Sequence, residues 1–238
     1  MRELAERELL DIWERGSDLH PVDRGLLALR TAFPATSYDT LARWPLGARN
    51  RALAELFGSW FGPGLEAWAA CDACGEQLEF EMDTRVLIAQ DAAPASAESA
   101  VAATVGSHSF RLPSSRDVAL AAREPTAELA AASLLRICWM GSGEAPAFSD
   151  QEIEEAGEQL ALADPLAELG VRLACPGCGC EWDDTLDLAL FVWAEVESRA
   201  KRILLDVVQL ARAYGWAEGE ILALSERRRR FYLDAAYP

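Results

Sequence analysis

Residues 71–75 read CDACG and residues 175–179 read CPGCG, so the chain carries one C-x-x-C-G motif twice. Two residues between the cysteines let both sulfur atoms face a single metal ion, and the glycine permits a tight turn that aims backbone N–H groups at the thiolates. Two such pairs form the usual structural cage for zinc, which accepts four thiolates tetrahedrally. The sequence therefore predicts one structural Zn2+ ion bound by Cys71, Cys74, Cys175 and Cys178.

The likeness between the two motifs continues beyond the cysteines. A shift of 104 positions aligns Gly75 with Gly179, Leu78 with Trp182, Met82 with Leu186, and Asp83 with Asp187. Each copy therefore predicts a turn, then a strand, then an aspartate that caps the next element. Apolar residues alternate with glutamates over residues 78–82, which is typical of a half-buried strand. We expect a zinc-ribbon-like pair of knuckles with a helical insertion between its halves.

Three other interpretations compete for these cysteines. All four could be ordinary buried residues, although two C-x-x-C-G units rarely arise by chance. A thioredoxin-like redox motif opens a helix after a strand, whereas each motif here precedes a predicted strand. Cys180 could replace Cys178 as a ligand, although the C-x-x-C spacing favours Cys178. Cys138 is expected to be a small core residue.

The rest of the chain predicts helices on both sides of the ribbon. Hydrophobic periodicity and proline or glycine boundaries predict short helices within residues 1–70. Between the motifs we expect a low-complexity linker, a hairpin and three helices, over residues 91–163. One long helix, about residues 186–214, carries apolar residues at steps of three and four, and short helices follow it. The predicted fold class is α+β, mostly helical, with three regions in one compact unit: residues 1–70, 71–186 and 187–238.

Composition argues against several classes of partner. Acidic residues outnumber basic ones by 39 to 22, which gives a net charge of −17. Binding to nucleic acid or to an anionic membrane needs a basic surface, so we expect neither partner. The N-terminus has no secretory pattern, and no apolar run approaches the roughly 20 residues that span a bilayer. We therefore expect a cytoplasmic protein, in which paired cysteines bind metal more readily than they form disulfides.

Catalytic patterns are missing from the sequence. The chain has only 2 histidines, whereas a catalytic zinc usually recruits histidine or carboxylate ligands and keeps one position open for water. No G-x-G-x-x-G, P-loop or G-x-S-x-G motif occurs. We therefore expect no enzymatic activity and no small-molecule substrate.

The C-terminal segment combines basic and aromatic residues. The four arginines at residues 227–230 point in four directions on a helix, and acidic residues are nearby. This pattern favours ion pairs within the chain or a protein partner. Aromatic residues and arginine are enriched at protein interfaces, although these aromatics could instead fold back onto the protein's own core. The candidate partner-binding residues are Trp216, Arg227, Arg228, Arg229, Arg230, Phe231 and Tyr232.

Five segments together resemble a known family. They are CDACGEQLEFEMD (71–83), FRLPSSRD (110–117), ADP (163–165), CPGCGCEWDDTLDLALFVWAEVE (175–197) and ARAYGWAEGEILALSERRRRFYL (211–233). The ensemble resembles the T-even-type phage baseplate protein family, often described as hub assembly chaperones, of contractile phage tails and related injection systems. The four motif cysteines match the metal positions of that family, and Tyr214, Gly215 and Trp216 match its tail signature. Two positions depart from it: Ala217 stands where a capping serine is usual, and Cys180 stands where a histidine is common.

The resemblance implies a role in assembly rather than in catalysis. We expect a non-enzymatic assembly chaperone or structural component of a contractile phage-tail-like baseplate, with baseplate or tail proteins as partners. Such a protein is either cytoplasmic or incorporated in a phage-like particle. The runner-up is a zinc-stabilised cytoplasmic adaptor or regulatory protein unrelated to tails. A nucleic-acid-binding zinc ribbon ranks third.

Overall fold

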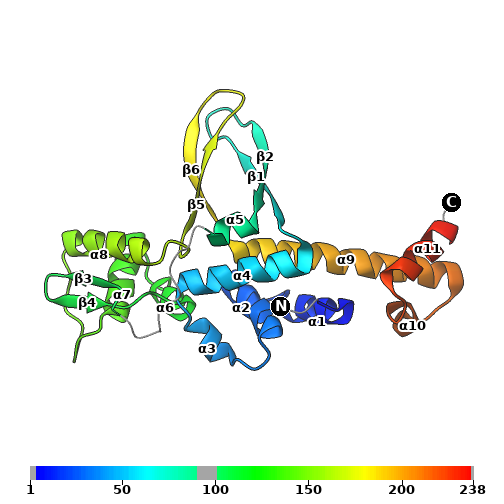
Figure 1. The fold of residues 1–238 in the computed structure, drawn as a ribbon, viewed down its shortest axis with the longest axis horizontal. Coiled ribbons are helices and arrows are strands. Elements are labelled where there is room, and N and C mark those ends of the chain that lie inside the picture. Colours follow the sequence, from blue (N-terminus) through cyan, green and yellow to red (C-terminus); the bar gives the residue numbers. More distant parts are fainter. Residues whose placement is uncertain (1–3, 90–100, 237–238) are drawn as a thin grey trace.

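The structure, a computed structural model, describes residues 4–89 and 101–236. Over these residues helices predominate, and the strands pair as antiparallel two-stranded hairpins, which confirms the predicted α+β class. Figure 1 shows a body of helices, two hairpins that stand side by side on this body, and a lobe at one end of it. The chain forms most of the body first, then a hairpin, the lobe and the second hairpin, and returns to the body.

The body is built around one long helix, as the sequence predicts. This helix, α9 (Leu188–Tyr214), packs against α1 (Glu6–Gly16), α2 (Pro21–Ala32) and α4 (Leu46–Phe61), and the short α3 (Tyr38–Ala42) packs against α2. Its buried stripe recurs every three or four residues and includes Val192, Val196, Ala200, Ile203, Val207 and Leu210. An apolar stripe of this width buries one whole face of a helix, so α9 is the central helix on which the body packs.

Each end of α9 has an identifiable cause. The carboxylate of Asp187 accepts a hydrogen bond from the backbone N–H of Ala189 (2.9 Å), so the helix begins two residues later than the sequence predicts. The other end is Gly215, which takes the left-handed conformation (φ 69°) that favours glycine. Beyond it lie α10 (Glu218–Leu222) and α11 (Glu226–Ala236), which pack back against α9.

Two hairpins rise from the body. The first consists of β1 (Gly64–Ala70) and β2 (Gln77–Asp83), and the second of β5 (Leu169–Ala174) and β6 (Glu181–Leu186). The sequence predicts β2 and β6, the strand that follows the turn in each copy, but it does not predict β1, which reads GLEAWAA and has no β-branched residue. A short helix, α5 (Thr84–Ala89), follows β2, and the carboxylate of Asp83 accepts from the backbone N–H of Arg85 (2.8 Å).

A separate lobe occupies the insertion between the two hairpins. It contains a small hairpin of β3 (Ala103–Val105) and β4 (His108–Phe110), with the helices α6 (Ser115–Ala121), α7 (Ala127–Cys138) and α8 (Asp150–Ala163). Its own core includes Ala103, Val105, Phe110, Leu135 and Ala156. These elements match the hairpin and helices that the sequence predicts there. The predicted linker, residues 91–100, lies outside the described residues.

The lobe is fastened to the start of α4. No side-chain hydrogen bond from Pro45 caps this helix. Instead, the carboxylate of Asp164, directly after α8, accepts a hydrogen bond from the backbone N–H of Gly47 (2.9 Å). The N–H of Leu46 donates to the carbonyl of Pro113 (3.0 Å). Segments 110–117 and 163–165, on which the resemblance partly rests, therefore meet at this junction.

Gly47→Ala should destabilise this junction. A Cβ atom at Gly47 would lie 1.7 Å from Oδ1 of Asp164, so the capping carboxylate would have to move away. Loss of a helix cap and local overpacking each cost about 1–2 kcal/mol, and we expect the free energy of unfolding to fall by roughly 2 kcal/mol in urea titrations. The matched control is Gly157→Ala in α8, where nothing lies within 4 Å of the added Cβ. There we expect a gain of up to about 1 kcal/mol, and equal effects at both glycines would contradict the capping role.

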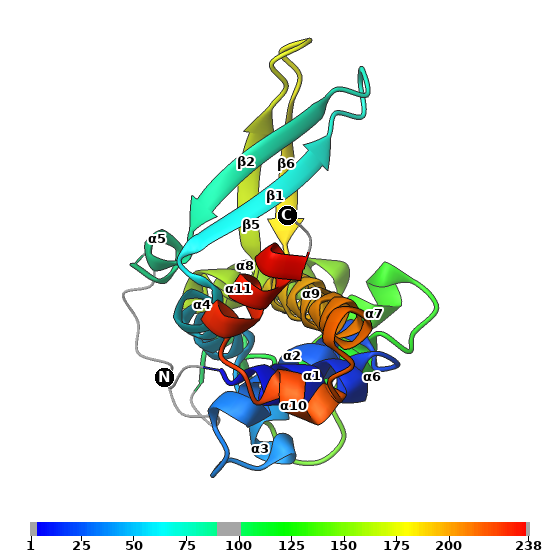
Figure 2. The ribbon, with the colours of Figure 1, turned by 90° about the vertical axis from the view of Figure 1, so that its right-hand side faces the viewer.

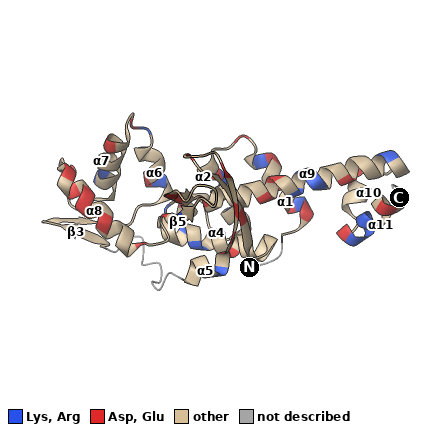
Figure 3. Ribbon diagram, turned by 90° about the horizontal axis from the view of Figure 1, so that it is seen from above, with Lys and Arg blue, Asp and Glu red and all other residues tan. Residues whose placement is uncertain are grey.

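Charge is distributed unevenly over the surface. Figure 3 shows acidic residues along α8 and basic residues gathered on α11. The sequence of α8, DQEIEEAGEQLALA, contains no basic residue, whereas α11 contains all four consecutive arginines. Among the described helices, none combines the length and the apolar character that crossing a membrane requires.

Candidate metal centre

The two hairpins are copies of each other in detail. In the first, pairing runs from Leu65 opposite Met82 to Ala70 opposite Gln77. In the second, it runs from Leu169 opposite Leu186 to Ala174 opposite Glu181, so every one of these pairs is shifted by the same 104 positions. Figure 2 shows the two hairpins rising together from the body with their tips close to each other. The sequence repeat is therefore a structural repeat.

The turns at the two tips are also equivalent. The N–H of Gly75 donates to the carbonyl of Cys71 (2.7 Å), and the N–H of Gly179 donates to the carbonyl of Cys175 (2.9 Å). Both glycines have φ of 75°, a left-handed conformation that a side chain would strain. These turns close the loop between the two cysteines of each motif, so each hairpin presents a pair of sulfur atoms at its tip.

The four motif cysteines meet where the tips come together. Their sulfur atoms all lie within 4.8 Å of one another. Two close separations join sulfur atoms of different hairpins: Cys71 to Cys178 is 3.7 Å, and Cys74 to Cys175 is 3.5 Å. Disulfide sulfurs would lie only about 2.05 Å apart, whereas neighbouring sulfurs around a tetrahedral ion with bonds of about 2.3 Å lie about 3.8 Å apart. The cluster is therefore compatible with a metal site.

The crowded thiols differ in acidity. Hydrogen bonds to the sulfur of Cys175 lower its pKa to about 7, and the largest contribution comes from the backbone N–H of Cys178. The backbone N–H of Glu76 acts to lower the pKa of Cys74, but the other thiols of the cluster outweigh it and raise that pKa to about 12. Four thiolates this close repel one another, so the cluster ionises fully only around a cation. A bound metal ion would supply that cation and release the protons.

Apart from the cysteine cluster, few buried side chains stabilise the two hairpins. No residue of β2 or β6 is buried, and in β1 only Leu65 and Ala67 are buried. The base of each hairpin joins the core of the body through Leu65 and Leu169, which are equivalent in the repeat. A two-stranded hairpin is at best marginally stable in water. The cysteine cluster at the tips therefore lies where a cross-link would add most to the stability of the hairpins.

The remaining cysteines lie outside this cluster. Cys180 is exposed, and in the repeat it occupies the place of Glu76: the N–H of Cys175 donates to the carbonyl of Cys180 (2.8 Å), as the N–H of Cys71 donates to that of Glu76 (2.9 Å). This symmetry favours Cys178 over Cys180 as the fourth ligand. Cys138 is fully buried, and burial raises its pKa to about 12.

The C-terminal candidate residues divide into two groups. The ring of Trp216 stacks on Tyr214, with 4.7 Å between ring centroids, and packs edge-on against Tyr232. These three aromatics fix the bend after α9, together with the hydroxyl of Tyr214, which donates to the carbonyl of Tyr232 (3.0 Å). Phe231, by contrast, is 68% exposed. Arg227, Arg228 and Arg230 are also exposed.

Arg229 does not lie on the surface with its neighbours. Its side chain is 1% exposed and forms an ion pair with the carboxylate of Glu6, at the start of α1. Its Nη1 also donates to the carbonyl of Leu224 (2.9 Å). Arg229 therefore ties the C-terminal helix to the N-terminal one and has almost no surface to offer a partner. The run of four arginines gives no sign of this, because only the tertiary contact distinguishes the third arginine from the others.

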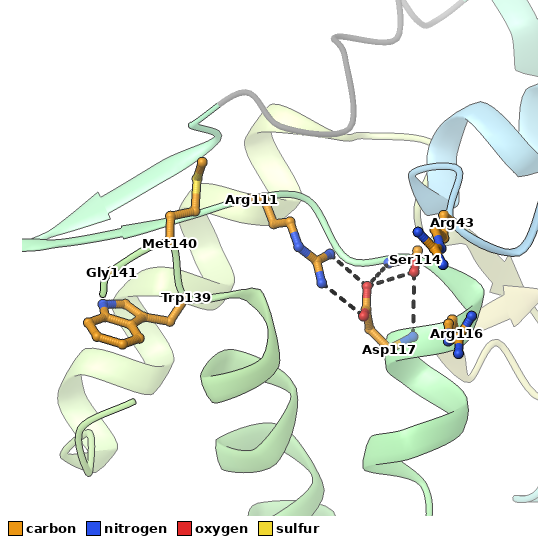
Figure 4. A pocket seen from close by; sticks show the side chains of 8 residues that line it. All are labelled: Arg43, Arg111, Ser114, Arg116, Asp117, Trp139, Met140 and Gly141. Carbon is orange, nitrogen blue, oxygen red and sulfur yellow. Dashed lines mark hydrogen bonds and ion pairs between the residues drawn. The ribbon is translucent and has the colours of Figure 1, made fainter. Parts of the chain in front are cut away.

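Away from the cysteine cluster, a cavity of about 540 Å³ is lined by three arginines, and Figure 4 shows the side chains around it. Arg111 forms two hydrogen bonds to Asp117 (2.7 and 2.9 Å), which also accepts from the backbone and hydroxyl groups of Ser114. The other two, Arg43 and Arg116, share the carboxylate of Asp39. Each guanidinium group is thus paired with a carboxylate, which indicates a structural role for this cluster.

Asp117→Asn should reduce stability in a pH-dependent way. Burial acts to raise the pKa of Asp117, but hydrogen bonds from Arg111 and Ser114 outweigh it and hold that pKa below its ordinary value. The stabilisation is therefore complete above the unfolded pKa of about 3.9 and is lost as the pH falls through the lower folded pKa. We expect the variant to lose about 1–3 kcal/mol at pH 7, as for a broken charged hydrogen bond, and the difference to shrink below about pH 4. Asp150→Asn, on the exposed face of α8, serves as the control, and a difference that is constant with pH would contradict the assignment.

No family model, curated protein or solved structure matches the chain in comparisons with known proteins, so its fold and metal centre rest on the residues described above.

Proposed function

We propose that this protein is a non-enzymatic assembly chaperone or structural component of a contractile-tail baseplate, and that a structural zinc ion clips its two hairpins together. The observation that carries the structural role of the metal is the cluster of four cysteine sulfurs, two from each hairpin. Four protein ligands complete the coordination of a tetrahedral ion and leave no position for the water that a catalytic zinc needs. The site therefore supports stabilisation and not turnover.

The ligand set supports zinc in particular. Thiolates are soft ligands, and a tetrahedral set of four sulfurs is typical of zinc or of iron–sulfur sites. The closed pairs at Cys71 with Cys74 and at Cys175 with Cys178 have the spacing of zinc knuckles. Elemental analysis of protein purified without added metal should find one zinc ion per chain. Well-folded protein that contains no metal, or iron in place of zinc, would contradict the proposal.

The baseplate role is supported by the residues of the resemblance, above all segments 175–197 and 211–233. The net charge of −17 fits protein partners with basic or apolar surfaces. In the genome, the coding sequence should lie among genes for the sheath, tube and spike of a contractile tail. When the gene is deleted, electron micrographs should show no complete baseplates. Complete particles assembled without the protein, or a locus without tail genes, would contradict the role.

Complementation of the deletion with cysteine variants tests whether baseplate assembly needs the metal site. We expect Cys71→Ser not to restore complete baseplates, because it removes one ligand of the ion. Cys180→Ser is the matched control, since this exposed thiol lies two residues from a ligand but outside the cluster. Rescue by both variants would separate the metal site from the assembly role.

A further inference from the structure

A groove runs between the bases of the two hairpins and the body. Its volume is about 840 Å³. The floor comes from α4 and α9, and the walls come from both hairpins, which Figure 1 shows standing over these helices. The apolar side chains that line it include Phe57, Phe61, Trp68, Phe80, Leu190 and Phe191. Since both hairpins contribute, the shape of the groove depends on how they are held relative to each other.

The groove leaves large apolar side chains in contact with solvent. Trp68 on β1 is 66% exposed, and Leu190 on α9 is 47% exposed. Exposed apolar groups gathered in a concave site are typical of a surface that another molecule covers, and tryptophan is enriched among the residues that contribute most to protein binding. The equivalent of Trp68 in the second hairpin is Arg172, so the indole is not a requirement of the hairpin fold.

The charges along the groove are mostly negative. Its lining includes the carboxylates of Glu66, Asp184, Asp187 and Glu195, against one basic group, Arg199. That guanidinium is already engaged, because it pairs with Glu195 and lies over the ring of Phe61. Glu66 stands directly opposite Glu81 in the strand register, and like charges in this arrangement repel. A basic group bound in the groove would relieve this repulsion.

We propose that this groove binds a segment of a partner protein that carries a large apolar side chain next to lysine or arginine. The apolar anchor would lie against Trp68 and Leu190, and the basic side chains would face Glu66 and Asp184. The metal clip sets the separation of the two hairpins, so binding depends on the metal. In this respect the inference rests on the proposed structural zinc site.

Selection from a displayed library of random 12-residue peptides tests the proposal without a known partner. We expect the wild-type protein to enrich peptides that combine a large apolar residue with lysine or arginine. Binding of these peptides should weaken at least tenfold in Trp68→Ser, and at least threefold in Glu66→Gln combined with Asp184→Asn. The matched control is Leu162→Ser in α8, where an 81% exposed apolar residue lies outside the groove, and we expect less than a twofold change. Removing the metal with a chelator should abolish binding.

The remaining outcomes overturn the proposal. They are failure to enrich any peptide, enrichment of acidic peptides, and binding that Trp68→Ser does not weaken. If the wild-type protein dimerises and Trp68→Ser makes it monomeric, the occupant is a second copy of this chain and not a basic segment. Zinc content, measured on every variant, separates the two proposals: a wild-type protein with one zinc but no groove binding refutes only the groove. A folded wild-type protein without metal that still binds the peptides refutes the zinc clip and the metal dependence.

Discussion

Cys71→Ser or Cys175→Ser should unfold both hairpins while the helical body survives. Structural zinc sites contribute apparent binding free energies of about 10–16 kcal/mol, which is comparable to the net stability of a whole domain, about 5–15 kcal/mol. The hairpins rely on this contribution because β2 and β6 have no buried residue. The body has its own large core around α9, so it does not depend on the metal in the same way.

Amide hydrogen exchange combined with zinc analysis measures this effect. We expect residues 64–83 and 169–186 to lose protection in either single variant, and α9 to keep it. The double variant should be no worse than either single one, because both cysteines share one ion. Cys180→Ser should keep its zinc and its protection. Full protection of the hairpins in the single variants would show that the cysteines do not hold them.

Arg229→Met should cost about 3–5 kcal/mol, because breaking a buried ion pair leaves its partner uncompensated. The side chain of Arg229 is 1% exposed and that of its partner Glu6 is 34% exposed, so the partner keeps some access to water and the lower end of the range is expected. Methionine preserves most of the aliphatic volume, so the loss reflects the charge and the hydrogen bond to Leu224. Arg228→Met, on the exposed face of α11, should change stability by less than about 0.5 kcal/mol.

A double-mutant cycle with Glu6→Gln isolates the pair itself. We expect a coupling free energy of about 1–3 kcal/mol between Arg229→Met and Glu6→Gln in urea titrations. Equal effects of Arg229→Met and Arg228→Met would contradict the buried pair. The contact also means that removing α11 would destabilise α1.

The metal cluster could be predicted from the sequence because its information is local. The spacing within each C-x-x-C-G motif predicts a turn. The repeat over 104 positions then predicts the strand and the capping aspartate in both copies. The long helix was predictable for a similar reason, since its apolar residues recur at helical spacing. In each case the pattern lies within one element or in two copies of one element.

Features formed by residues far apart could not be predicted in this way. Asp164 caps α4 through the backbone N–H of Gly47, which lies 117 residues earlier, and Arg229 pairs with Glu6 across 223 residues. The groove draws its walls from two hairpins and its floor from two helices, so no single segment reveals it. The strand β1 could not be predicted because alanine and glycine do not favour strands. It forms through its pairing with β2.

X-ray absorption at the zinc edge, on protein purified without added metal, reads the ligands of the ion directly. We expect one zinc per chain, surrounded by four sulfur atoms at about 2.3 Å, and the same spectrum for Cys180→Ser. Nitrogen or oxygen neighbours in place of a sulfur would contradict a site closed by Cys71, Cys74, Cys175 and Cys178. A folded protein without zinc would contradict the metal clip itself.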